Sequence, residues 1–407
     1  MPVKSLPTSD EMVEKSVPPS HELEFKTYRE WDGDRPSQTV IFHDGSSSWW
    51  IRVKINLSLR ESMPRLGFFR RREMVRGFIE AIDFRHLDLL DDTVTRISLT
   101  LVEQSPKPIP TRRFRHEDQT KPNFLLSIAH RVSFQIDEDP EKMIYPILDP
   151  AQDLPTFEAN LLENEEFITA AVSIVCFRQK RFAYKKVDRD LYIRGDEENI
   201  VNEITALTYF RGQPNIAQLV GLVISHHPYK THPHTISSMV ITGFLLEYHP
   251  NGSLEQVLAE NTDHDDSMLR RWALQTGRAL EIMHTHGRTH LDIKPANVVI
   301  DTNKNAILID ISGTGGYVWE WLSPEMIETL QDDTLPMDAS FDQRVATDCW
   351  AYGKILLKMT KKIGATSFGK GLQSIGEDMT KMEPKDRISL SDALERIVGL
   401  EPRCIVG

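Results

Sequence analysis

The sequence lacks several features that would assign it quickly to a class of protein. It contains only three cysteines, Cys176, Cys349 and Cys404, whose wide spacing indicates neither a disulfide framework nor a zinc site. No stretch approaches the ~20 apolar residues that a membrane helix requires, and the start MPVKSLPTSDEMVEKSVPPS has no apolar segment typical of a secretory signal. We therefore expect a cytoplasmic or nuclear protein with no membrane partner.

Positive charge is also scarce. Acidic side chains outnumber basic ones and give a net charge of -12, whereas a nucleic-acid-binding domain normally carries a clearly basic surface. We therefore expect no nucleic-acid partner. The hydrophobic fraction of 40% and the charged fraction of 27% are those of an ordinary globular protein, and 407 residues favour two or three domains.

The first part of the chain predicts a tail and a small domain. Residues 1–34 are polar and rich in proline and serine, which is typical of a disordered tail. Residues 35–150 predict a mixed or β-rich domain of no recognised family, which we expect to contact a partner or regulate the rest of the chain. Its predicted elements are two strands around the turn at 43–46, a helix within 71–90, and strands within 95–104 and 125–136.

The second part of the chain has a different pattern. Residues 151–164 predict a linker. Residues 165–400 then show several strands, one helix, two more strands and mostly helices. Strands followed by helices predict an α+β fold in which the two are segregated, and not a doubly wound sheet.

The strongest motif is His290-Leu-Asp292-Ile-Lys294-Pro-Ala-Asn297, which an apolar run follows. Phosphoryl transfer needs positioning and electrostatic stabilisation more than covalent help from the protein. Asp292 can orient an acceptor hydroxyl and take its proton, and Lys294 can neutralise the moving phosphoryl group. Asn297 and Asp310 can supply oxygen ligands of the kind that magnesium prefers.

This arrangement resembles the protein kinase superfamily over residues 165–400. The resemblance implies a bilobal fold, with a small β-rich lobe plus one helix at 165–248 and a large, mostly helical lobe at 249–400. It also implies ATP and Mg²⁺ as cofactors and a protein or peptide as substrate.

The resemblance further implies which residues hold the nucleotide. Lys185, in Phe182-Ala-Tyr-Lys185, corresponds to the lysine that contacts the α- and β-phosphates and pairs with a helical glutamate, here Glu203. Glu247 and His249 lie in a segment similar to the hinge, whose backbone binds adenine. The other expected nucleotide contacts are Ala183 on the lysine strand and Ala170, Ser173 and Val175 around the phosphate-binding loop.

Two more motifs support the resemblance. Ser323-Pro-Glu325 is similar to the family's Ala-Pro-Glu, and Arg387 corresponds to the arginine that pairs with this glutamate. Asp348 begins a segment similar to Asp-x-Trp-x-x-Gly, whose aspartate braces the catalytic loop. Eight such elements stand in the family's order along the chain.

The chain departs from the family at three places. The loop segment 168–175 contains no glycine, which predicts weaker clamping of phosphate because backbone amides approach a phosphate most closely at glycine. Leu291 replaces an arginine that in many kinases holds a phosphorylated activation loop, so we expect constitutive or unusual regulation. The stretch 348–387 is short, which predicts the loss of a helix that commonly docks protein substrates.

Three functions stay open on the sequence alone. The first is a serine/threonine protein kinase, because a lysine two residues after Asp292 is the serine/threonine pattern. The second is a pseudokinase or scaffold that binds nucleotide or partners without turnover, which the glycine-free loop suggests. The third is a kinase that acts on a peptide or small metabolite, which the short stretch 348–387 suggests.

Overall fold

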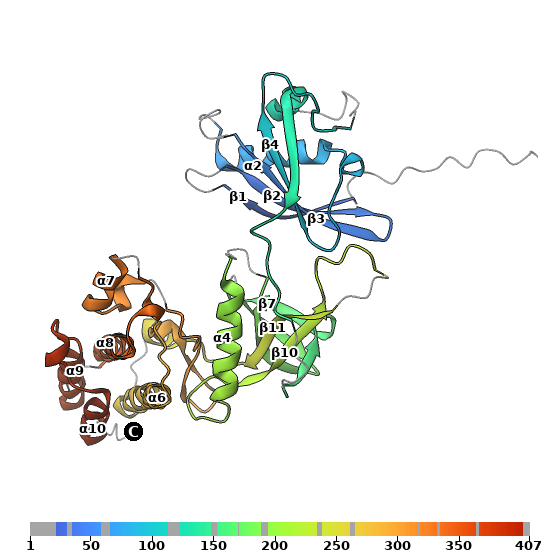
Figure 1. The fold of residues 1–407 in the computed structure, drawn as a ribbon. Helices are drawn as coiled ribbons and strands as arrows, with labels where there is room; N and C mark the ends of the chain where they lie inside the picture. The colour runs from blue at the N-terminus through green and yellow to red at the C-terminus, as the bar shows by residue number, and fades with distance from the viewer. Residues whose placement is uncertain are drawn as a thin grey trace, which may run out of the picture. The chain divides into compact units, whose positions relative to one another are not determined.

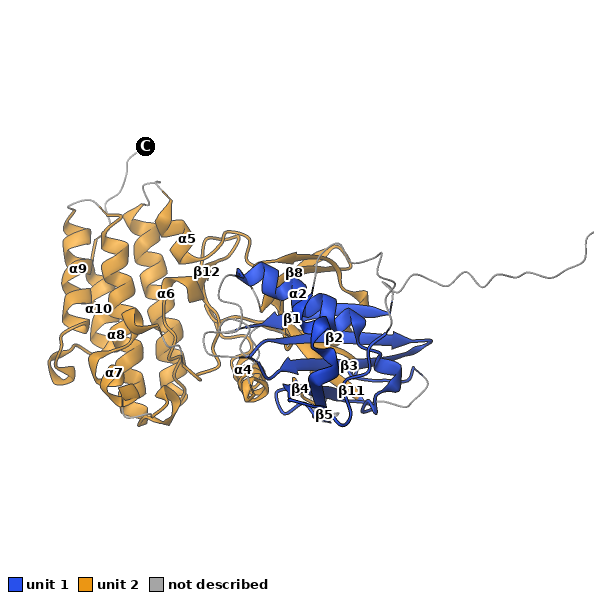
Figure 2. Ribbon diagram, turned by 90° about the horizontal axis from the view of Figure 1, so that it is seen from above, with its two compact units in different colours: residues 1–142, 226–238 blue, residues 143–225, 239–407 orange. Residues whose placement is uncertain are grey.

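The computed structural model divides the chain into two units, residues 1–142 with 226–238 and residues 143–225 with 239–407 (Figures 1 and 2). Each unit is described by itself. The structure describes residues 22–30, 35–57, 66–112, 123–147, 153–169, 171–188, 194–233, 238–260, 265–315, 318–331, 334–363 and 366–401.

The first unit is built on a five-stranded sheet in the order β1-β2-β3-β4-β5. Only β3 and β4 run parallel, and the helix α2 connects them, as a parallel crossover requires. The turn between β2 and β3 contains Gly45 at φ +61°, a left-handed conformation that glycine adopts without strain. The bounds are β1 Leu23–Arg29, β2 Ser37–Asp44, β3 Ser47–Ile55, α2 Phe68–Ala81, β4 Val94–Leu101 and β5 Val132–Glu138.

Alternation along these strands places the core on one face of the sheet. Val40, Ile51 and Ile97 are fully buried and share one cluster with Val75 and Phe78 of α2. Side chains between them on β3 and β4 point to the opposite face, because successive residues of a strand alternate. The helix therefore packs on one face, and the other carries Arg52, Lys54 and Arg96 beside the apolar Trp50.

Two expectations for this unit are corrected. The domain begins at β1, so Leu23–Arg29 belongs to the sheet and not to a disordered tail. Residues 125–131, expected as strand, form the helix α3 (Phe124–Ser127) and a 3-10 turn (Ala129–Arg131) before β5 begins. The Asn123 side chain accepts a hydrogen bond from Leu125 N, and this N-cap favours helix where the apolar residues alone suggested strand.

The second unit has two lobes. The small lobe contains a six-stranded sheet in the order β6-β10-β11-β9-β8-β7, with the helix α4 beside it (Figure 1). The bounds are β6 Thr156–Glu158, β7 Glu163–Phe167, β8 Val172–Phe177, β9 Lys180–Lys186, α4 Asp196–Tyr209, β10 Leu219–His226 and β11 Met239–Glu247. This is the β-rich lobe with one helix that the sequence predicts.

The expected linker 151–164 is also corrected, because part of it lies in this sheet. β6 pairs in parallel with Leu222–Ile224 of β10, and β7 begins at Glu163. Gly221 permits the close approach of this segment, since a Cβ at that position would lie 2.3 Å from the Pro155 carbonyl oxygen. A three-residue strand has too short a pattern for its sequence to reveal it.

The large lobe is mostly helical, as expected. It also contains the short hairpin β12-β13, which lies between α6 and α7 in the chain. α6, α8, α9 and α10 run side by side (Figure 2). Six residues separate α8 from α9, too few for another helix, which agrees with the expected loss of a docking helix. The bounds are α5 Leu254–Ala259, α6 Asp266–Thr285, β12 Val298–Ile300, β13 Ala306–Leu308, α7 Pro324–Gln331, α8 Phe341–Thr360, α9 Ser367–Met379 and α10 Leu390–Gly399.

The segment 226–238, between β10 and β11, belongs to the first unit. Trp50 Nε1 donates to the Pro228 carbonyl oxygen at 2.9 Å. Asp92 and Thr231 exchange two hydrogen bonds, from Asp92 N to Thr231 Oγ1 at 2.8 Å and from Thr231 N to Asp92 Oδ1 at 2.9 Å. The sequence indicated a polar loop here, but nothing in it indicated that the loop packs on the N-terminal sheet.

Candidate active site

The catalytic loop lies between α6 and β12 and is held by one buried carboxylate. Asp348 of α8 is 1% exposed. It accepts hydrogen bonds from His290 N at 2.8 Å and Leu291 N at 2.7 Å, and it lies 2.9 Å from His284 Nε2. Leu291 adopts φ +61°, which is unfavourable for a residue with a side chain, so these bonds to Asp348 stabilise a strained loop.

Asp292, Lys294 and Asn297 meet on this loop. Lys294 Nζ lies 2.6 Å from Asp292 Oδ2, and Asn297 Nδ2 donates to the same oxygen at 2.8 Å. Asn297 Nδ2 also donates to the Asp292 backbone carbonyl at 2.8 Å. The structure therefore brings together the carboxylate, ammonium and amide that the sequence motif predicts, with Asp292 held in one orientation.

A second charged cluster joins the two lobes of this unit. Lys185 Nζ on β9 lies 2.9 and 2.7 Å from the two carboxylate oxygens of Glu203 on α4, and 2.7 Å from Asp310 Oδ1 after β13. Glu203 is 3% exposed. Charges paired at this range inside a protein interact far more strongly than in water, so the cluster fixes α4 and Asp310 relative to β9.

The electrostatics of this cluster keep both kinds of group ionised. Burial alone lowers the pKa of Lys185, but the charges of Asp310 and Glu203 outweigh it and raise that pKa above its ordinary value. Burial alone raises the pKa of Asp310, but the Lys185 ammonium outweighs it and holds that pKa below its ordinary value. The lysine stays cationic and the aspartate anionic at neutral pH.

The structure corrects the placement of two expected nucleotide contacts. In the pairing of β8 with β9, Ser173 lies opposite Tyr184 and Val175 lies opposite Phe182. Val175, Phe182 and Tyr184 belong to one buried cluster on the face of the sheet away from Lys185. Ser173 and Val175 therefore face away from the charged cluster, because partners across a ladder share a face.

Two residues that the sequence reasoning did not name lie on the Lys185 face instead. Val172 lies opposite Lys185 and Ile174 opposite Ala183, so both share the face that carries Lys185. Leu246 of β11 flanks Ala183 from the other side, and these apolar side chains form one surface. Pairing the strands across the two-residue turn, with Phe177 opposite Lys180, leads to these two residues, whereas counting alternate residues straight back from Lys185 leads to Val175 and Ser173. Ala170 lies outside the described residues.

The turn between β7 and β8 engages its own backbone amides. Thr169 Oγ1 accepts hydrogen bonds from Ala171 N at 3.3 Å and Val172 N at 3.1 Å. Ile168 N and Thr169 N both donate to the Val172 carbonyl oxygen at 3.0 Å. Amides that are already bonded within the turn are less available to a phosphate, in line with the weaker clamping that the missing glycines predict.

The predicted hinge residues Glu247 and His249 line a pocket of about 270 Å³ with segment 212–218 and Asp301. This pocket includes neither Lys185 nor Asp310. Burial lowers the pKa of His249 below its ordinary value, although Glu247 and Asp301 act in the opposite direction. Glu247 N donates to the Gln218 carbonyl oxygen at 3.2 Å, so this amide is already bonded within the protein.

The expected pair of Glu325 and Arg387 is present and bidentate. The Arg387 guanidinium lies 2.7 and 2.8 Å from the two Glu325 carboxylate oxygens. Burial alone raises the pKa of Glu325, but the hydrogen bond and charge of Arg387 hold it below the ordinary value. The pair links the start of α7 to the segment before α10, and it thereby fixes the end of the activation segment 310–323.

Leu291, which stands where many kinases have arginine, makes apolar contacts. It is 2% exposed and forms a buried cluster with Leu322 and Met326 from the end of the activation segment and α7. Burial of three such side chains stabilises this arrangement by several kcal/mol, at roughly 1.5–3 kcal/mol for each. The catalytic loop and the activation segment are therefore joined by hydrophobic packing.

Comparison with known proteins agrees with this geometry. The protein kinase domain family matches residues 170–389. The chain is 26% identical over 205 residues to serine/threonine-protein kinase PKH2 of Saccharomyces cerevisiae, and this match covers 44% of this chain and 17% of that protein. It is 24% identical over 240 residues to serine/threonine-protein kinase ppk21 of Schizosaccharomyces pombe, covering 54% and 40%.

A third relative is a serine/threonine-protein kinase-like protein of Arabidopsis thaliana, 34% identical over 158 residues, covering 34% of this chain and 41% of the relative. The matches thus span less than half the length of these relatives. A bilobal fold with this pair of charged clusters defines a phosphotransferase-type domain. With more than half of its residues matched, the chain belongs to the protein kinase family.

None of the helices in the described residues is long and apolar enough to cross a membrane.

Proposed function

We propose that the chain is an ATP- and magnesium-dependent protein kinase that transfers phosphate to serine or threonine side chains. The observation that carries this proposal is the meeting of Asp292, Lys294 and Asn297 on one braced loop, beside Asp310 that is itself paired with Lys185. Every charged group that phosphoryl transfer needs is present and hydrogen-bonded.

Each polar side chain of the site has a separate role in this proposal. Asp292 orients the acceptor hydroxyl and accepts its proton, and Lys294 neutralises charge on the transferred group. Asn297 turns its amide nitrogen towards Asp292, which leaves its amide oxygen as a ligand. That oxygen and the ionised Asp310 carboxylate fit a magnesium ion, which prefers hard oxygen donors and which, when bound, neutralises phosphate charge. Lys185 contacts the phosphates.

Adenine fits the apolar surface of the small lobe. Ala183, Ile174 and Leu246 supply that surface, and the backbone of Glu247 and His249 supplies hydrogen-bonding groups at its end. The choice of serine or threonine is supported by Lys294, placed two residues after Asp292, and by the names of the three relatives.

The test measures transfer of the γ-phosphate of labelled ATP, with magnesium, to a mixture of unrelated proteins by the full-length chain. Asp292→Asn removes the proton acceptor but keeps the shape, so transfer should fall by roughly 10²–10⁴-fold. Lys142→Gln, in the other unit, is the matched control and should transfer at the wild-type rate. Retained transfer in Asp292→Asn would overturn the assignment of the base.

A second candidate is a domain that binds nucleotide or partners without turnover. The bonded amides of the turn at Thr169 favour it, because they weaken the grip on phosphate. Thermal unfolding with ATP and magnesium separates the cases, since a ligand of the native state raises its stability. A magnesium-dependent shift that Asp310→Ala abolishes, without any transfer, would support this candidate over the first.

A third candidate, a kinase for a peptide or small metabolite, is favoured by the six-residue connection between α8 and α9, which leaves no docking helix. The same labelled ATP, offered with short serine peptides and with a mixture of hydroxyl metabolites, distinguishes it. Transfer to these acceptors but not to folded or denatured proteins would replace the first proposal by the third.

The packing of Leu291 suggests how the domain is regulated. An arginine at that position reads a phosphate, whereas Leu291 contacts Leu322 and Met326 without any charge. We therefore propose that the activation segment is held in place by apolar contacts and does not need phosphorylation to order it.

A further inference from the structure

The face of the N-terminal sheet opposite α2 carries a group of basic side chains. On β3, Arg52 and Lys54 alternate with Val53, which is buried in the core under α2. Arg96 on β4 lies directly opposite Arg52 in the parallel register. These three cations therefore share the face that the helix leaves open.

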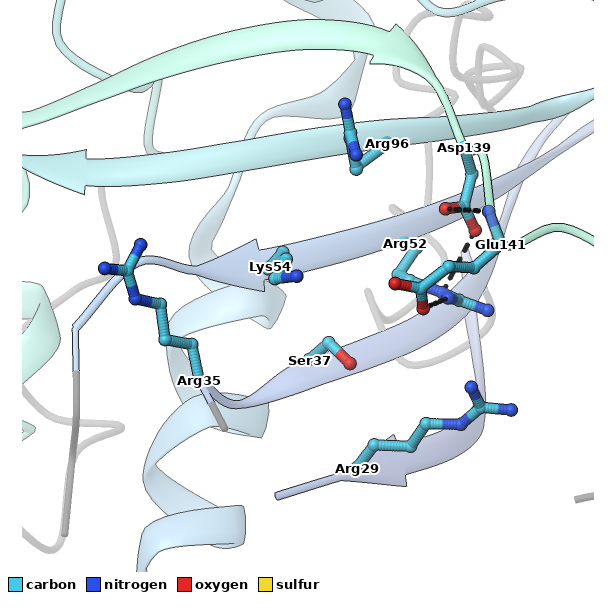
Figure 3. A pocket seen from close by; sticks show the side chains of 8 residues that line it. All are labelled: Arg29, Arg35, Ser37, Arg52, Lys54, Arg96, Asp139 and Glu141. Atoms are coloured by element: carbon cyan, nitrogen blue, oxygen red, sulfur yellow. Dashed lines mark hydrogen bonds and ion pairs between the residues drawn. The ribbon is translucent and has the colours of Figure 1, made fainter. Parts of the chain in front are cut away.

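These side chains line a pocket of about 110 Å³ (Figure 3). We call it the basic pocket, and its residues come from all five strands or the segments next to them: Arg29, Arg35, Ser37, Arg52, Lys54, Arg96, Asp139 and Glu141. Five cations against two carboxylates give the pocket a formal charge of +3, whereas the whole chain carries -12. The local charge is thus opposite in sign to that of the protein.

Both carboxylates in the pocket are used by one arginine. Arg52 Nε lies 3.1 Å from Asp139 Oδ2, and Arg52 Nη1 lies 2.7 Å from Glu141 Oε2, as the dashed lines in Figure 3 show. Asp139 is 1% exposed and donates its backbone N–H to the Val94 carbonyl at 2.8 Å. This anchored pair forms one fixed wall of the pocket.

Three other cations keep binding capacity. Lys54 forms no ion pair with any described residue, and Arg35 donates only to the neutral amide of Asn56, at 3.2 Å. Arg96 makes a single long ion pair, 3.5 Å to Asp137, and its Nε is buried without a hydrogen-bond partner in the described part of the chain. A buried donor left unbonded is unfavourable, so the protein does not fully satisfy the Arg96 guanidinium.

We propose that the basic pocket binds the phosphate of a phosphoserine or phosphothreonine in a protein segment. A phosphate monoester brings nearly two negative charges and three acceptor oxygens, which match arginine forks and a lysine ammonium. The Ser37 side chain is a neutral group that also lines the pocket. The volume is well below the ~300–1,000 Å³ of sites for larger ligands, so a single phosphate group fits better than a whole nucleotide.

The surroundings favour a peptide over a polyanionic surface. The exposed Glu24 and the partly exposed Asp137 place carboxylates on the same face of the sheet, next to the cations. A nucleic acid or an anionic membrane would place many charges against these carboxylates, whereas one phosphate on a peptide meets only the pocket. The proposal is independent of phosphoryl transfer by the kinase domain.

The experiment uses the full-length chain without ATP. Binding is measured by fluorescence anisotropy with a labelled degenerate peptide library that has phosphoserine or phosphothreonine at its centre, beside the same library without phosphate. Lys54→Gln and Arg96→Gln should each weaken binding about tenfold or more, because each removes a charge-assisted hydrogen bond. Lys107→Gln, an equal loss of charge outside the pocket, should bind like wild type.

A further variant protects the test against misfolding. Arg35 is exposed, so Arg35→Gln should leave the thermal unfolding midpoint unchanged and still weaken binding of the phosphorylated library. Equal binding of both libraries, or equal loss in Lys107→Gln, would overturn the proposal. So would binding of vesicles rich in phosphatidylserine, or of inorganic phosphate alone, in place of the phosphorylated library.

Discussion

Replacing Asp348 with asparagine tests whether one carboxylate holds the catalytic loop. Its Oδ1 accepts Leu291 N at 2.7 Å, and its Oδ2 accepts His290 N at 2.8 Å and lies 2.9 Å from His284 Nε2. Asparagine has the same shape but carries one acceptor and one donor. Whichever way its amide turns, at least one backbone N–H of the loop then faces another N–H.

The cost follows from these contacts. A hydrogen bond to a charged group contributes about 1.5–3 kcal/mol, and a bond to a neutral amide is roughly half as strong. Losing one bond and weakening the others should destabilise the loop by about 2–4 kcal/mol. Leu291 at φ +61° adds to the tendency to rearrange, because the bonds to Asp348 help to offset its strain.

Hydrogen–deuterium exchange of the loop amides measures this directly. Local opening that is easier by 2–4 kcal/mol corresponds to exchange at His290 and Leu291 that is roughly 30- to 1,000-fold faster. Phosphoryl transfer, if the proposed activity holds, should fall in parallel, because Asp292 follows these residues directly. The exposed Asp342 lies on the same helix, and Asp342→Asn serves as the control that should change exchange at neither amide.

The reasoning would be refuted by unchanged protection of both amides in Asp348→Asn. That result would mean that the apolar cluster around Leu291 alone fixes the loop, and that the buried carboxylate is dispensable. Equally faster exchange at all amides of the large lobe, with no larger effect at His290 and Leu291, would also refute it, because it would indicate global destabilisation.

Two further predictions concern the phosphate-binding turn and the Glu325 pair. Thr169→Ala frees the backbone amides of Ala171 and Val172 that the Thr169 hydroxyl binds. Because one hydrogen bond contributes about 1 kcal/mol, calorimetry should show that ATP binds about fivefold more tightly. Unchanged affinity would show that these amides do not contact phosphate. Glu325→Gln should destabilise the protein by about 3 kcal/mol at pH 7, because it leaves Arg387 unpaired. The pKa of Glu325 is lowered in the folded protein, so the stabilisation by its carboxylate is complete above the ordinary value of 4.5 and is lost as the pH falls through the lowered value. The stabilities of the wild type and Glu325→Gln should therefore converge in acid. A difference in stability that does not depend on pH would contradict this.

The sequence by itself determined which polar side chains meet on the loop at 290–297. Asp292, Lys294 and Asn297 are close in the chain, and their spacing within one loop leaves little freedom in how they meet. The pairing of Lys185 with Glu203 and the nearby Asp310 was predicted through the family pattern, which carries information about distant contacts that residue chemistry alone does not. The two lobes were predicted through the same resemblance, and the short stretch 348–387 predicted that few residues would separate α8 from the next helix.

The sequence did not determine the pairing register of the strands. A shift of one residue turns every side chain of a strand to the other face, and this decided that Val172 and Ile174, not Ser173 and Val175, share the face of Lys185. Short elements such as β6 carry too weak a pattern to be detected, and their place depends on a close approach at Gly221. The hydrogen bonds of the backbone amides to Thr169 could likewise not be predicted without the backbone conformation.

Only the tertiary structure decided what the N-terminal unit offers. Arg29, Arg52, Arg96 and Asp139 are separated by tens of residues, and each reads in the sequence as an ordinary surface charge. The strand order and the parallel register of β3 with β4 bring them to one pocket. The same holds for segment 226–238, which lies between two strands of the small lobe in sequence yet packs on the N-terminal sheet. Local spacing can be read from a sequence, whereas contacts between distant segments depend on packing that the chain reaches only when folded.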